Sequence, residues 1–256
     1  MVVLPLEKNM SRFRQAKKRL LVELTQDDWE QSCNVQTAEE ALSLIGPLLA
    51  MLPREELHWR AAYCLGKVIA VLASLDRDAA RNLMRRLMWS LNEESGNLGW
   101  GIPESMGCIV VESPLMAEEY ERIIISYIID TGKSSNFIDH GPLRKAVYWA
   151  IGHVAKYRKE ALWQSLPWLI TGLEKDDHMP CRGMAAWAIA QLAEWHQKHN
   201  VAPQFQQIPM WRQALIALAE LEDVADPIEV FEDKTPHNIS CAKAAERARK
   251  AIEAIL

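Results

Sequence analysis

The sequence predicts an all-α protein made of about five stacked helical hairpins. Apolar residues recur at intervals of three and four along most of the chain, and the alternation that marks strands is scarce. The connections between the apolar stretches are short and carry Gly, Pro, Asp or Asn. Segments of similar sequence also recur at wide intervals, which is typical of a repeat protein.

The periodic stretches predict eleven helices. In chain order they cover residues 9–24, 37–52, 57–74, 77–94, 102–112, 115–131, 142–157, 159–175, 181–199, 208–224 and 239–255. The longest interruption runs from Asp226 to Asn238 and contains Pro227 and Pro236. We expect a loop there, which would let the last helix act as a cap.

Four segments align without gaps and share a small residue followed by apolar ones: 57–68, 98–109, 142–154 and 180–192. Taking Gly66, Gly107, Gly152 and Ala190 as equivalent gives spacings of 41, 45 and 38 residues. These spacings exceed the roughly 34 residues of a tetratricopeptide unit and match a two-helix repeat of about 40 to 47 residues. Small residues at the four positions would let neighbouring helices approach closely.

The last two segments carry a further motif. Residues 162–190 combine Leu-Pro-x-Leu, an acidic turn and a second helix with the pattern Arg182-x-x-Ala185-x-x-Ala188-Ile189-Ala190. The pattern Arg144-x-x-Val147-x-x-Ala150-Ile151-Gly152 repeats the second half. Over roughly residues 37–195, the chain therefore resembles the HEAT repeat proteins, including the HEAT-like variety named after phycobilisome lyases.

This resemblance implies an armadillo-like, right-handed α–α superhelix in a single domain over residues 1–256. Residues 1–35 would form an N-terminal helical cap, residues 37–195 four repeats, and residues 208–256 a C-terminal helical pair or cap. The first two repeats are degenerate, because His58 and Gly99 stand where the pattern prefers Arg.

One side of each repeated second helix is predicted to line a groove. The apolar positions cluster on the other side, which forms the core, and second helices usually line the concave surface of stacked repeats. The candidates for a ligand-binding groove are Trp59, Tyr63, Trp100, Glu104, Trp149 and Trp187. Exposed aromatic side chains on a rigid surface are suited to anchoring a partner. The alternative is that the indoles pack between helices or beneath the N-terminal cap.

Within this set, the segment 96–107 is unusual because glycines and Pro103 replace helix-forming residues. Such a segment allows close backbone approach and a sharp helix entry. Glu104 falls near the helix N-terminus, where a negative charge is stabilised. Both a ligand-facing turn and a tight structural turn fit this pattern.

Composition and charge disfavour several classes of protein. A net charge of -5 speaks against a surface built to hold nucleic acid. The five cysteines are widely spaced, without a C-x-x-C pair, so we expect reduced thiols and no zinc cluster. The N-terminus lacks a secretory signal pattern, and no apolar run reaches the roughly 18 residues of a membrane span. We therefore expect a cytoplasmic protein without membrane association.

The sequence holds no nucleophile elbow, phosphate-binding loop or dinucleotide fingerprint. His178 and Cys181 have a spacing that can place two metal ligands on one helical face, but further partners are missing, so neither a metal nor a cofactor is expected. Arg144 and Arg182 occupy matching repeat positions and are expected to bond an acidic turn, such as the one at Asp176 or at Asp139.

These observations favour a non-enzymatic interaction module that binds a protein or peptide in a Trp-rich concave groove. The alternative is an enzyme, because some DNA-alkylation-repair glycosylases are similar to this chain in size and are built from HEAT-like repeats, with tryptophans and one carboxylate lining a cationic groove. That resemblance would give roles to Trp100, Glu104, Arg144 and Trp187. It is weakened by a Glu where that family has Asp and by the negative net charge.

The resemblance to phycobilisome lyases suggests a third function, the handling of a tetrapyrrole. The sequence lacks a Cys or His pair placed to attach one. The sequence does not specify an oligomeric state.

Overall fold

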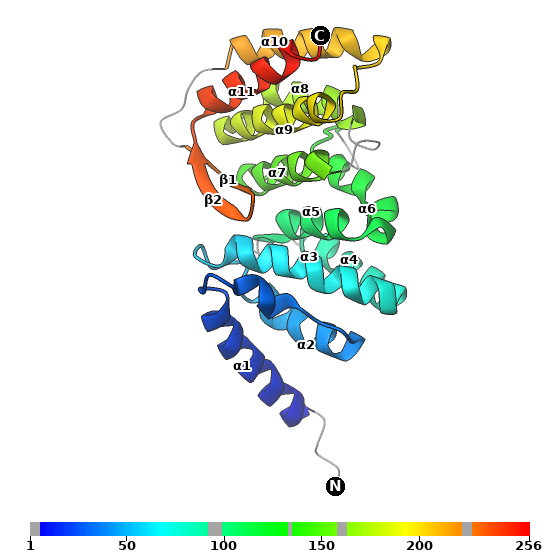
Figure 1. Ribbon diagram of the computed structural model, residues 1–256, viewed down its shortest axis with the longest axis vertical. Coiled ribbons are helices and arrows are strands. Elements are labelled where there is room, and N and C mark those ends of the chain that lie inside the picture. The colour runs from blue at the N-terminus through cyan, green and yellow to red at the C-terminus, as the bar shows by residue number, and fades with distance from the viewer. Residues whose placement is uncertain (1–5, 92–98, 133–134, 158–162, 222–226) are drawn as a thin grey trace. The chain divides into compact units, whose positions relative to one another are not determined.

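The computed structural model describes residues 6–91, 99–132, 135–157, 163–221 and 227–256 (Figure 1). The chain divides into two compact units, unit 1 (Met1–Glu119) and unit 2 (Tyr120–Leu256), and the boundary falls within one helix. The described residues contain eleven α-helices and one two-stranded sheet. The prediction of a mainly helical protein is confirmed.

The described residues of unit 1 fold mainly into helices. Its elements are α1 (Leu6–Glu23), the 3-10 helix η1 (Trp29–Cys33), α2 (Ala38–Leu49), α3 (His58–Leu75), α4 (Arg77–Leu91), α5 (Ile102–Glu112) and the first part of α6 (Pro114–Ser126). These α-helices match the predicted ones within a few residues, although positions 92–94 lie outside the described part. The sequence did not predict η1.

Helix α3 is the centre of unit 1, because it packs against α2, α4 and α5. Its approach to α5 depends on Gly66, where an added Cβ would lie 2.7 Å from the Cβ of Cys108. No real side chain fits in that space, so Gly66 has the close-packing role predicted for it. Helix α2 is fixed at its start by a capping box, in which Thr37 and Glu40 each accept a hydrogen bond from the other's backbone N–H.

Unit 2 contains the second part of α6, a row of helices and a small hairpin. The elements are α7 (Gly141–Tyr157), η2 (Trp163–Ser165), α8 (Leu166–Lys175), α9 (Met179–Lys198), η3 (Phe205–Gln207), α10 (Ile208–Ala219), β1 (Ile228–Glu232), β2 (Thr235–Ile239) and α11 (Cys241–Glu253). The helices again match the predicted ones, except that α6 ends at Ser126 and not at 131, and α10 ends at Ala219 and not at 224. Positions 159–162 and 222–224 of the predicted ranges are not described.

Helices α7, α9 and α11 lie side by side in this order (Figure 1). Helix α8 packs against α9 and α10, which places α8 and α10 in a second layer. The contact between α7 and α9 depends on Gly152, where an added Cβ would lie 2.9 Å from the Cα of Ala188. As at Gly66, a glycine therefore marks a close helix pair.

The prediction of a loop over residues 226–238 is wrong, because strands β1 and β2 form an antiparallel hairpin there. Its register pairs Ile228 with Ile239 and Glu232 with Thr235. The tight turn places Asp233 and Lys234 at positive φ angles of 49° and 64°, as two-residue hairpin loops require. The hairpin covers part of α9 and is the main element that the helical periodicity could not predict.

None of the described helices is long and apolar enough to cross a lipid bilayer. The five cysteines are all free thiols and all buried.

Candidate functional site

Two exposed indoles flank an apolar pocket in unit 1. The side chains of Trp89 on α4 and Trp100 before α5 are 78% and 39% exposed. Between them lies a pocket of about 380 Å³, here called the Trp100 pocket. It is lined by Leu49, Leu52, Pro53, Leu83, Arg86, Leu87, Trp89, Ser90, Gly99, Trp100 and Ile102. Large exposed apolar groups around a concave apolar surface are a common mark of a binding site.

The backbone before α5 holds Trp100 at this surface. Gly101 has a φ of 75°, a left-handed conformation that favours glycine. An added Cβ at Gly101 would lie 2.9 Å from the Cβ of Leu52, so the turn also packs tightly against the end of α2. The hydroxyl of Ser105 donates to the carbonyl of Gly101 over 2.6 Å. The described part of the segment 96–107 therefore combines the predicted tight turn with an exposed indole.

Among the described residues that line the pocket, Arg86 is the only charged one. Arg77 and Arg81, on the same helix as Trp89, both form ion pairs with Glu119, at 2.7 Å and 2.8 Å. The hydrogen bonds from Arg81, followed by those from Arg77, hold the pKa of the Glu119 carboxyl below its ordinary value. Arg86 lines the pocket and is exposed, and within the described part of the chain no carboxylate forms an ion pair with it. As far as the described residues go, the pocket thus offers apolar surface beside a guanidinium that forms no ion pair.

Glu104, a predicted groove residue, is instead buried and held by His58. Its Oε1 lies 2.9 Å from Nε2 of His58, whose Nδ1 lies 2.8 Å from the carbonyl of Leu52. Because a carbonyl oxygen only accepts, Nδ1 carries a hydrogen, so the contact between Nε2 and the carboxyl group needs one further shared proton. The pair ties α3 and α5 to the end of α2. Glu104 therefore supports the wall of the Trp100 pocket without lining it.

The other two predicted groove residues of unit 1 pack against neighbouring aromatic rings. Trp59 is buried and meets the ring of His58 edge-on at 5.1 Å. Tyr63 is half-buried and meets Trp29 of η1 edge-on at 5.2 Å. Tyr63 thus takes the alternative position considered above, beneath the N-terminal elements, and neither ring belongs to the Trp100 pocket.

In unit 2 the predicted surface position of Trp149 and Trp187 is wrong, since their side chains are 0% and 1% exposed. The two indoles lie nearly parallel, with ring centroids 6.4 Å apart, and His153 stacks on Trp149 at 4.7 Å. The hairpin is fixed to the same helices by polar contacts. Gln191 of α9 donates to Glu232 over 2.9 Å, and an ion pair of 2.8 Å joins Lys156 of α7 to Asp233. The two indoles therefore belong to the core of unit 2 and do not line the groove expected here.

Arg144 forms the bond to an acidic turn that its repeat position predicted. Its guanidinium donates to both carboxylate oxygens of Asp176 at 2.7 Å, to Asp177 at 2.6 Å, and to two backbone carbonyls at 2.8 Å. The side chains of Arg144 and Asp176 are each only 3% exposed. Arg182 differs from the prediction, because its Nε donates to the backbone carbonyl of Leu173 at 2.6 Å.

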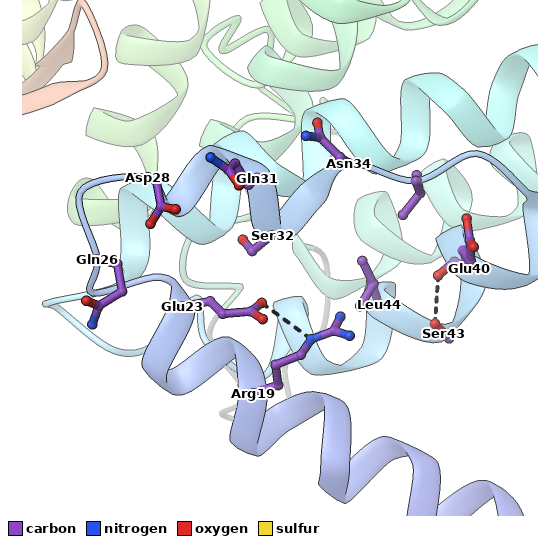
Figure 2. A pocket seen from close by; sticks show the side chains of 11 residues that line it. Arg19, Glu23, Gln26, Asp28, Gln31, Ser32, Asn34, Glu40, Ser43 and Leu44 are labelled. Carbon is purple, nitrogen blue, oxygen red and sulfur yellow. Dashed lines mark hydrogen bonds and ion pairs between the residues drawn. The ribbon is translucent and has the colours of Figure 1, made fainter.

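A second, polar pocket of unit 1 lies between α1, η1 and α2 and has a volume of about 460 Å³ (Figure 2). Arg19 and Glu23 form an ion pair of 3.3 Å within it. Glu40 accepts hydrogen bonds from the backbone N–H groups of Gln36 and Thr37, which lower the pKa of its carboxyl group. These polar groups serve the local structure, so this pocket is the weaker candidate.

Comparisons with known proteins identify no family. No family model matches the chain, and no curated protein matches it. Among solved structures, the chain is similar to the crystal structure of an engineered protein from a structural genomics consortium. The two share 14% sequence identity with a TM-score of 0.48, over 93% of this chain and 96% of the other.

Proposed function

We propose that this protein is a non-enzymatic interaction module that binds a peptide segment of a partner protein at the Trp100 pocket. The observation that carries the proposal is the pair of exposed indoles at a pocket with apolar walls. Indole side chains supply large contact areas and dominate many interfaces. The tight turn at Gly101 and the buried pair of His58 with Glu104 keep the site rigid, which reduces the entropy lost on binding.

The chemistry of the pocket specifies the kind of peptide. An aromatic or branched aliphatic side chain would enter between Trp89 and Trp100 and cover the leucines of the wall. A carboxylate close to it in the peptide would pair with Arg86, which has no such partner in the described residues. An apolar anchor beside an acidic residue is therefore the expected recognition motif.

We also propose that the helical hairpins stack as HEAT-like repeats. The row of α7, α9 and α11 and the contact of α3 with α5 support this arrangement within each unit, as do the close approaches at Gly66 and Gly152. Five buried free thiols suit a reducing compartment such as the cytoplasm.

No observation favours the glycosylase alternative. Arg144 is saturated by carboxylates and carbonyls and is not available to a phosphate. Trp187 is buried, and Glu104 pairs with His58.

The proposal is tested by selecting peptides from a random library on the immobilised protein and measuring their affinities by fluorescence anisotropy. Selected peptides should share an apolar anchor next to Asp or Glu. Trp89→Ala and Trp100→Ala should each weaken binding by about tenfold or more, as the removal of interface tryptophans does. Arg86→Glu should weaken binding of the same peptides and reverse its dependence on salt.

Phe205→Ala is the matched control, because Phe205 is an aromatic residue of unit 2 with 87% exposure. It should leave the affinity unchanged. Failure to select any peptide motif, or equal binding by the two Trp variants and the native chain, would refute the proposed site.

A further inference from the structure

Unit 2 contains a second aromatic cavity, which is separate from the buried pair Trp149 and Trp187. It has a volume of about 310 Å³ and is lined by three tryptophans: Trp163 of η2, Trp195 of α9 and Trp211 of α10. Their exposure falls from 44% at Trp163, through half-buried Trp195, to 2% at Trp211. The rings therefore extend from the mouth of the cavity to its floor. This volume is at the lower end of the range found for small-molecule sites.

The cavity is held in shape by hydrogen bonds. His196 is buried, and its Nδ1 donates to the carbonyl of Val201 over 2.8 Å. Its ring meets Trp195 and Trp211 edge-on, at 5.6 Å and 5.9 Å. At the end of the following loop, the Oε1 of Gln207 accepts from the backbone N–H of Gln204 over 3.0 Å. The cavity walls are thus built before any ligand binds.

The polar groups of the lining limit the kinds of ligand that the cavity can bind. Among the described residues, no Lys, Arg, Asp or Glu side chain lines the cavity. Polar atoms of His196 and Gln207 are already used to hold the loop. An anion, or a cation that must donate hydrogen bonds, would lose more hydration than these walls replace. A quaternary ammonium group has no N–H to satisfy, and indole faces attract it through their negative quadrupole.

We propose that the cavity lined by Trp163, Trp195 and Trp211 binds the quaternary ammonium group of a small solute. Trp is the aromatic residue that binds such cations best, and no Lys or Arg among the described residues lines the cavity to repel one. The proposal is independent of the peptide site in unit 1, because it rests on other residues.

The test uses the full chain labelled with ¹⁵N and follows the indole N–H resonances during titration with choline and with tetramethylammonium. The control ligand is 3,3-dimethylbutan-1-ol, which has the shape of choline but carbon in place of the charged nitrogen. We expect at least one of the two cations to shift the Trp163 indole resonance and to bind about fivefold or more tightly than the neutral alcohol. Equal or tighter binding of the alcohol would show a simple apolar cavity and overturn the proposal.

Variants separate this cavity from the rest of the surface. Trp163→Ala removes a partly exposed ring at the mouth and should weaken binding of the cation about fivefold or more. Trp89→Ala, which removes an exposed indole of unit 1, should leave that binding unchanged while it weakens peptide binding. Absence of binding by both cations, or an equal loss in both variants, would also overturn the proposal.

Discussion

The two units use tryptophans in opposite ways. In unit 1 the glycine-rich turn before α5 leaves Trp100 exposed beside Trp89. In unit 2 the indoles Trp149 and Trp187 are sealed, and the β1–β2 hairpin is bonded to the helices that carry them. The difference shows that helical periodicity predicts which way a side chain points, while the packing of other parts of the chain decides whether solvent reaches it.

The buried charges differ as well. Unit 1 buries one carboxylate against one imidazole, at Glu104 and His58. Unit 2 buries the Arg144 guanidinium among two carboxylates and two carbonyls. The larger network involves a permanent charge, and its removal should have the larger effect on stability.

The largest effect is expected from Arg144→Met. Loss of the guanidinium leaves the buried Asp176 carboxylate without its principal partner, which should cost about 3 to 5 kcal/mol of unfolding free energy. Denaturant unfolding measures this loss. Hydrogen exchange should show faster opening of α7–α9, with α3–α5 less affected. Arg86→Met, at an exposed arginine, is the control and should change stability by less than about 0.5 kcal/mol.

A double variant distinguishes two causes of the stability lost in Arg144→Met, which are an unpaired buried charge and lost packing. Adding Asp176→Asn to Arg144→Met removes the stranded negative charge and should restore part of the stability. If the double variant is no more stable than Arg144→Met, the loss came from packing and the comparison of charges between the units fails.

Smaller effects are expected from the close helix contacts. Gly152→Ala and Gly66→Ala each place a methyl group against a neighbouring helix, which should destabilise the protein by about 1 to 3 kcal/mol. Gly132→Ala cannot serve as the control. Gly132 has a φ of 79°, a left-handed backbone conformation in which an alanine would itself be strained. The exposed Ser74 of α3 offers a better one, and Ser74→Ala should have little effect. Thermal unfolding checks all three. A native melting temperature in both glycine variants would contradict the close-contact assignment.

His153 should make unit 2 sensitive to moderate acid. Burial, with Lys156 as a further cause, lowers the pKa of His153 below its ordinary value of 6.5. The unfolded chain therefore binds a proton that the folded chain does not, and stability falls as the pH drops below 6.5, by at most about 1.4 kcal/mol per pH unit. His178 has a lowered pKa and acts with the same sign.

His153→Phe keeps a ring beside Trp149 and removes the titrating group. The variant should lose less stability than the native chain between about pH 7 and about pH 5, as measured by urea unfolding. The lowered pKa values of the Asp176 and Glu232 carboxyl groups act in more acidic solution and do not obscure the comparison. An unchanged slope in the variant would mean that His153 is protonated equally in both states.

The sequence predicted the helices and the core better than the surface. The apolar period found every α-helix, and the glycine-rich turn pointed to Trp100. Trp89 was missed, although it lies off the apolar stripe of α4 formed by Ala80, Leu83, Met84 and Leu87. The hairpin was read as a loop because of its prolines. Pro236 is tolerated in β2 because the sheet has only two strands, so that each strand has a free edge.

The smallest expected effect, and the most direct test of the comparison, is a change in fluorescence quenching by acrylamide. Trp89→Phe removes an accessible emitter, so the average quenching constant of the remaining tryptophans should fall. Trp187→Phe removes a sealed emitter, so the average should rise. The substitutions are otherwise alike, since each replaces one indole by a smaller ring. Opposite signs follow only if the indoles of the two units differ in access to solvent. A fall in both variants would place Trp187 at an open surface and restore the groove that the sequence predicted for unit 2.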